Sequence, residues 1–167
     1  MIELLILVIF PAALIFAAVS DIATMTISNW ISLVLLGTFP VLALAAGMPL
    51  SDVGWHFAAG GLVLAGCFAL FAFNVIGGGD AKLLAAAALW IGWSDLFTLL
   101  IYTALFGAPI CIFLVAFRLF PMPNWLFKLG WFNHLHEAKA GVPYGVAISA
   151  AGLVLFSETP MMNIAAV

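Results

Sequence analysis

Two aspartates stand where apolar segments of this 167-residue sequence end or begin. Asp21 follows the apolar run from Ile2 to Ser20, and Asp80 follows three glycines and precedes another apolar run. An acid at membrane depth is costly, which makes such residues candidates for function. Two carboxylates held close share a proton, so the ionised one can deprotonate a water while the protonated one polarises a peptide carbonyl. The pair predicts aspartic protease chemistry, with no cofactor, no metal and no serine or cysteine nucleophile.

A structural reading stays open for each acid, because either one could simply mark a helix end in the headgroup region. Asp80 would suit the first turn of a helix, where free N–H groups and the dipole favour a carboxylate. The glycines Gly77, Gly78 and Gly79 lack a Cβ and tolerate positive φ. We expect them to end the preceding helix, to present Asp80 on a tight turn and to let backbone or substrate approach closely. Lys82 lies about 200° around that helix from Asp80 and is interpreted as an interfacial anchor, with a tuning role in the site as an alternative.

Other sites are less well supported by the sequence. The two cysteines, Cys67 and Cys111, lie inside apolar runs without ligand spacing, which favours neither a zinc site nor a disulfide framework. His134, His136 and Glu137 form a loose H-x-H-E pattern that we weigh only as a minor metal-binding alternative. The sequence therefore predicts no metal site.

The composition requires a lipid environment. The sequence is 67% hydrophobic and 7% charged, whereas soluble domains are about half apolar and about a quarter charged. Lipid is the solvent that suits such a chain. No basic patch is present, so we expect the bilayer and no nucleic acid as a partner.

The elements that must position the acids are predicted to be membrane helices. Polar residues, glycines and prolines divide the chain into six apolar segments, of which the fourth and sixth are shorter than the roughly 20 residues of a full span. The segments run from Ile2 to Ser20, Trp30 to Ala46, Trp55 to Ile76, Lys82 to Trp93, Leu96 to Phe117 and Val142 to Phe156. We expect an all-α, polytopic membrane protein with about six transmembrane helices, forming a single membrane-embedded domain over residues 1–167 with no separate soluble domain. The aromatic-rich stretch 118–141 is predicted to be interfacial.

The cations predict the orientation. If the N-terminus lies outside, all four fall at cytoplasmic connections and the outer connections carry none, as the positive-inside rule requires. These cations are Lys82, Arg118, Lys128 and Lys139. The same orientation places Asp21 and Asp80 together at the cytoplasmic face.

Three motifs resemble those of one family. The stretch from Asp21 to Asn29 resembles the first catalytic motif of type IV prepilin peptidases, and Gly77-Gly78-Gly79-Asp80-Ala81-Lys82 resembles their GxGD-x-K motif. Val142-Pro143-Tyr144-Gly145 resembles the opening of their last helix. The resemblance implies that Asp21 and Asp80 are catalytic and that Gly77, Gly78, Gly79, Lys82 and Asn29 shape the site. It implies cleavage of leader peptides from prepilin and pseudopilin precursors, at the cytoplasmic face of the cell's inner membrane.

The chain departs from that family at two points. Ser28 stands where the family usually has proline, although either residue can start a helix. The sequence also lacks the four cysteines of the zinc domain that longer members use for N-methylation. It is similar to the short, peptidase-only form found with Flp/Tad pili or with archaeal prepilin processing, and its length favours the Flp/Tad kind. A small proton-coupled transporter using the same acids, and a non-catalytic scaffold for pilus assembly, remain alternatives. The sequence does not predict the oligomeric state.

Overall fold

The structure is a computed structural model, and it describes residues 1–119, 141–159, 161 and 162. Within these residues the chain forms six α-helices, as the all-α prediction requires. They are α1 (Ile2–Thr24), α2 (Asn29–Ala45), α3 (Leu50–Ala72), α4 (Gly78–Ile91), α5 (Leu96–Leu119) and α7 (Tyr144–Phe156). The predicted interfacial segment 118–141 lies almost wholly outside the described residues. The cluster of His134, His136 and Glu137 lies wholly outside them.

Three of the described helices, α1, α3 and α5, are long and apolar enough to cross a membrane. The others are shorter, with 17 residues in α2, 14 in α4 and 13 in α7. The fourth and sixth predicted segments therefore do form short helices. The number of membrane crossings remains a prediction.

The third and fourth helices both begin earlier than predicted. Helix α3 starts at Leu50 after the Pro49 cap, and it ends at Ala72 rather than Ile76 because the chain turns at Phe73 and Asn74. Asn74 takes the left-handed conformation, with φ of 57°. Helix α4 starts at Gly78 rather than Lys82, so that Asp80 lies inside its first turn.

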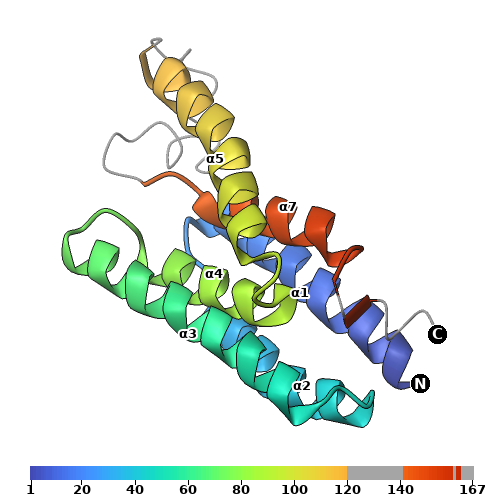
Figure 1. Ribbon diagram of the computed structural model, residues 1–167. Coiled ribbons are helices and arrows are strands. Elements are labelled where there is room, and N and C mark those ends of the chain that lie inside the picture. The colour runs from blue at the N-terminus through green and yellow to red at the C-terminus, as the bar shows by residue number, and fades with distance from the viewer. Residues whose placement is uncertain (120–140, 160, 163–167) are drawn as a thin grey trace.

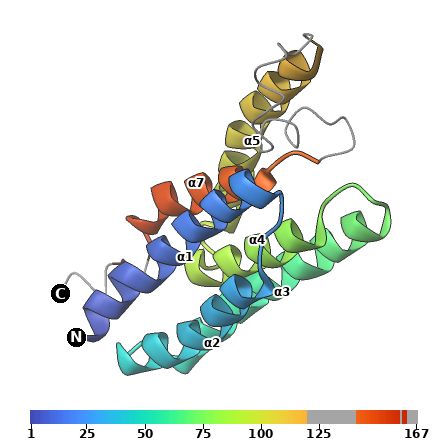
Figure 2. The same ribbon diagram turned by 180° about the vertical axis from the view of Figure 1, so that it is seen from behind.

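Helix α4 lies at the centre of the bundle, and it packs against α3, α2, α7 and α5. Figures 1 and 2 show it between α3 on one side and α1 and α7 on the other, while the C-terminal half of α5 extends away from the bundle. Every residue of α4 from Leu83 to Ile91 is buried. A run of four alanines, Ala85 to Ala88, explains the enclosure, because small side chains let neighbouring helices approach closely in a membrane.

Trp90 connects α4 to α1 and α2. Its ring is fully buried and stacks on Phe10 of α1 at a centroid distance of 5.0 Å. Its indole N–H donates a hydrogen bond to the Leu35 carbonyl of α2 at 2.9 Å. One side chain thus holds α1, α2 and α4 together.

We expect Trp90→Ala to lower the free energy of unfolding by on the order of 3 kcal/mol, because it opens a cavity and removes a buried hydrogen bond. Unfolding with SDS in mixed micelles measures the change. Trp30→Ala is the matched control, since Trp30 is 74% exposed, and it should cost less than about 0.5 kcal/mol. Equal losses in the two variants would contradict the anchoring role of Trp90.

Candidate active site

Asp21 lies on the last turn of α1, and its side chain is only 4% exposed. The helix ends at Thr24. The next residue, Met25, takes the left-handed conformation, and its backbone N–H donates a hydrogen bond to the backbone carbonyl of Asp21 at 2.8 Å. The Asp21 carboxylate accepts a hydrogen bond of 2.7 Å from the backbone N–H of Gly145. That donor lies in the first turn of α7, where N–H groups have no partner within the helix and the dipole favours negative charge.

Asp80 is the third residue of α4, and its carboxylate turns back toward Gly77, the N-cap of that helix. An acid in the first turn is favoured by the free N–H groups and the dipole at a helix start. A Cβ at Gly77 would stand 2.8 Å from the Asp80 Oδ2 atom, too close for any side chain. The missing side chain is what allows this contact.

The three glycines differ from the prediction in conformation, but they allow the close approach that was also expected of them. Gly77 has φ of −70°, and positive-φ glycines among the described residues are Gly47 and Gly92. The tract does not end α3, which stops five residues earlier at Ala72. Close approach is the property that the structure uses, since a Cβ at Gly79 would lie 3.2 Å from the Cβ of Ile27.

Gly145 is the site residue that the sequence analysis missed. A Cβ at this position would stand 2.7 Å from the Oδ2 atom of Asp21 and 2.7 Å from the Cδ1 atom of Ile27. The available signal was a glycine directly after Pro143 and Tyr144 at a predicted helix start. The motif was identified, but a contact across 124 residues of sequence has no local signature.

Ile27 packs between the part of the site that carries Asp80 and the part that carries Asp21. It belongs to the short connection between α1 and α2, and its side chain lies against Gly79 of α4 and Gly145 of α7. Hydroxyl groups hold this connection in place: Ser20 donates to the Thr26 carbonyl at 2.9 Å, and Thr24 donates to the Ser20 carbonyl at 2.8 Å. The ends of three helices are thereby held around one apolar side chain.

Both aspartates line one cavity of about 670 Å³. The charges of the two carboxylates are close enough to interact. The remaining wall comes from the connection between α1 and α2, from the segment between α3 and α4, and from the start of α7. It includes Met25, Thr26, Ile27, Phe71, Asn74, Val75, Ile76, Gly77, Gly78, Gly79, Gly141, Val142 and Tyr144. A space of this size can admit water and an extended peptide to two carboxylates.

Lys82 and Asn29 lie outside that cavity. The Lys82 ammonium donates a hydrogen bond of 2.8 Å to the Asn29 side-chain oxygen, and both residues line a separate groove between α2, α3 and α4. Lys82 therefore extends toward α2, as its angular distance from Asp80 predicts. In the part of the chain that the structure describes, no group of three or more His, Cys, Asp or Glu side chains is placed to hold a metal ion.

The hydrogen bond between Asp21 and Gly145 can be tested by amide exchange. In Asp21→Ala the Gly145 amide loses a charged acceptor worth about 1.5–3 kcal/mol, so its exchange should accelerate roughly 10- to 100-fold. Hydrogen–deuterium exchange of the peptide covering 142–148 gives the rate. Asp80→Ala is the matched control, which should leave the exchange of Gly145 unchanged. Equal protection of Gly145 in Asp21→Ala and the parent would refute this contact.

Comparison with known proteins adds an independent observation. A sequence model described as the type IV leader peptidase family matches residues 8–112. No curated protein and no solved structure gives a significant match. The matched region contains both aspartates and the three glycines, and it covers more than half of the chain. The chain therefore belongs to the type IV leader peptidase family.

Proposed function

We propose that this protein is a membrane aspartic endopeptidase of the GxGD type that removes leader peptides from prepilin and pseudopilin precursors. Membership of the type IV leader peptidase family supports a peptidase that acts on prepilin-type substrates in a membrane. The single observation that carries the catalytic assignment is the cavity shared by Asp21 and Asp80. Within it, the Asp21 carboxylate accepts a hydrogen bond from the Gly145 backbone N–H.

In the proposed reaction the two carboxylates share the proton transfers. One of them takes a proton from a water molecule as that water attacks the carbonyl carbon of the scissile peptide bond. The other donates its proton to the carbonyl oxygen, which gives a tetrahedral diol. The carboxyl group that took the proton of the water then gives it to the peptide nitrogen, while the other carboxylate takes a proton back from a diol hydroxyl. The C–N bond breaks, leader and mature protein are released, and both carboxyl groups return to their starting state. The backbone donor at Gly145 would hold the Asp21 carboxylate in position throughout.

The proposal includes the placement of the site in the cell. With the N-terminus outside and six crossings, the cavity would open at the cytoplasmic face of the inner membrane. A leader that remains in the cytoplasm while the following segment is anchored in the bilayer would reach the carboxylates at that face. The sequence carries two cysteines, so it does not itself supply a four-cysteine zinc site for methyl transfer.

We expect Asp21→Asn and Asp80→Asn each to lower the rate of leader removal at least about 100-fold, because either change removes one member of the acid–base pair. The assay uses the purified protein in liposomes with a prepilin substrate, and mass spectrometry identifies the new N-terminus. Asp52→Asn is the matched control: Asp52 lines a different cavity, with His56 and Trp93, and should leave the rate unchanged. Normal processing by either of the first two variants would remove that aspartate from the mechanism.

The proposed orientation predicts which connections face the outside. In a background with Cys67→Ala and Cys111→Ala, Ser51→Cys should react with an impermeant maleimide in intact cells. Ser28→Cys, next to the site, should react only after the cells are opened. Both positions are exposed, and the Ser28 side chain makes no cap hydrogen bond, so the substitutions are mild. The reverse labelling pattern would show that the protein has the opposite orientation in the membrane.

A further inference from the structure

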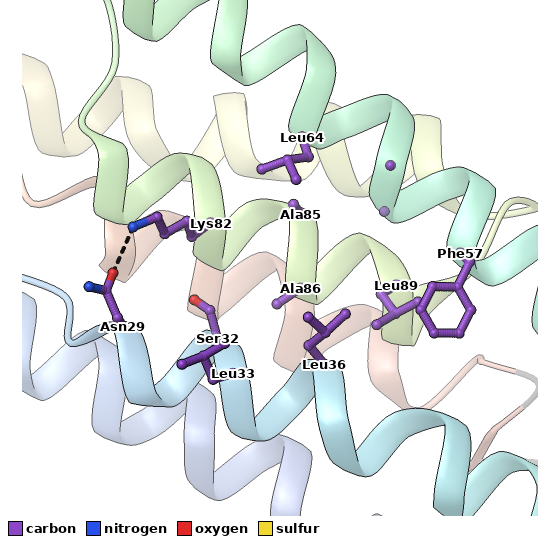
Figure 3. Close-up of a pocket in the computed structure, with 12 residues that line it drawn as sticks. Asn29, Ser32, Leu33, Leu36, Phe57, Leu64, Lys82, Ala85, Ala86 and Leu89 are labelled. Carbon is purple, nitrogen blue, oxygen red and sulfur yellow. Dashed lines mark hydrogen bonds between the residues drawn. The ribbon is translucent and has the colours of Figure 1, made fainter.

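A second depression lies on the opposite side of α4 from the aspartates. It is a groove of about 520 Å³ between α2 and α3, with α4 as its floor (Figure 3). Its walls are almost entirely apolar, and they come from Leu33 and Leu36 of α2 and from Phe57 and Leu64 of α3. Gly60, Gly61, Ala85, Ala86 and Leu89 line the groove as well. No residue of this groove lines the catalytic cavity.

The groove is polar at one end only. Lys82 and Asn29 meet there, at the end of α4 that also carries Asp80 (Figure 3). Within the described residues, the Lys82 ammonium is bonded to the neutral Asn29 and forms no ion pair with a carboxylate. The Ser32 hydroxyl, one turn along α2, is buried and has no hydrogen-bond partner among the described residues. Within the described residues, a cation without a carboxylate partner and a hydroxyl without a hydrogen-bond partner thus lie beside an apolar surface.

The dimensions favour a lipid chain over a protein helix. Lys82 and Leu89 are seven residues apart, which gives the groove a length of about 10 Å. A transmembrane helix of about 20 residues is about 30 Å long, roughly three times the length of the groove. The groove provides about 520 Å³, within the usual range of about 300–1,000 Å³ for small-molecule sites. A transmembrane helix could insert only part of one face.

We propose that this groove is a binding site for an anionic phospholipid. The phosphate would lie at the Lys82 ammonium, with the Ser32 hydroxyl as a second donor, and an acyl chain would follow α4 toward Leu89 and Phe57. Basic residues between membrane helices are suited to anionic headgroups, and the charge of Lys82 lacks a protein counterpart in the described structure. The inference does not depend on the proposed peptidase activity.

Gly61 and Gly66 provide a matched pair of variants for testing the apolar part. Both are exposed glycines of α3, and a Cβ at either meets nothing within 4 Å. Gly61 lines the groove and Gly66 does not. We expect Gly61→Leu to fill the groove and to reduce the amount of bound lipid at least about fivefold, whereas Gly66→Leu should retain it. Gly60 is unsuitable, because its Cβ would lie 3.1 Å from the Ala85 carbonyl oxygen.

Variants of Lys82 test the part of the groove that would bind the lipid headgroup. Lys82→Gln should weaken the binding of phosphatidylglycerol about fivefold, the effect expected for one basic residue near an anionic lipid, and Lys82→Arg should preserve it. The same change should leave binding of zwitterionic phosphatidylcholine unaltered, so the preference between the two lipids is the decisive readout.

The experiment is native mass spectrometry of the full-length protein, released from detergent with defined mixtures of phosphatidylglycerol and phosphatidylcholine. One retained phosphatidylglycerol that is lost in Gly61→Leu and Lys82→Gln, but kept in Gly66→Leu and Lys82→Arg, supports the site. Retention of that lipid in Gly61→Leu, or equal retention of the two lipids by the parent, overturns it. Binding of inorganic phosphate alone with the same dependence on Lys82, and no lipid retained, also overturns it. Because the readout is lipid mass, a failure here leaves the peptidase proposal untouched.

Discussion

The candidate site depends on one hydrogen bond between the first and last described helices. The Gly145 N–H of α7 donates to the Asp21 carboxylate of α1 at 2.7 Å. A buried carboxylate without such a donor would be strongly disfavoured, and a helix start offers unpaired N–H groups. The contact needs a glycine at 145, since a side chain there would meet both Asp21 and Ile27. The end of α1, the start of α7 and the connection after Asp21 are therefore constrained together.

Asp80 is also favoured by a helix start, but by that of its own helix. It lies in the first turn of α4, and the glycine at 77 leaves room for its carboxylate. Helix starts thus favour both acids through different geometry, one within a helix and one between helices. Ile27 connects them, because it packs on the glycine beside Asp80 and on the glycine that binds Asp21. Small changes in how α4 and α7 pack would therefore alter the positions of both carboxylates.

Much of this arrangement could be predicted from the sequence, and the limits have physical causes. Long apolar runs predict the helices of a membrane protein, and Asp21 and Asp80 mark helix ends because charged groups avoid lipid. The bounds of α3 and α4 were wrong since glycines were expected to end α3, whereas Phe73 and Asn74 turn the chain instead. The roles of Gly145 and Lys82 were not predictable, because they depend on which helices become neighbours. That choice follows from packing, which apolar content alone does not specify.

The enclosure of α4 has a consequence for how the protein enters the membrane. At 14 residues it is shorter than the roughly 20 that a lone span needs, and its sides are covered by α2, α3 and α7 rather than by lipid. Its burial is therefore a product of helix assembly rather than of its own length or composition. The donor for Asp21 belongs to α7, which also covers α4. The packing that encloses α4 and the hydrogen bond that satisfies Asp21 therefore form together.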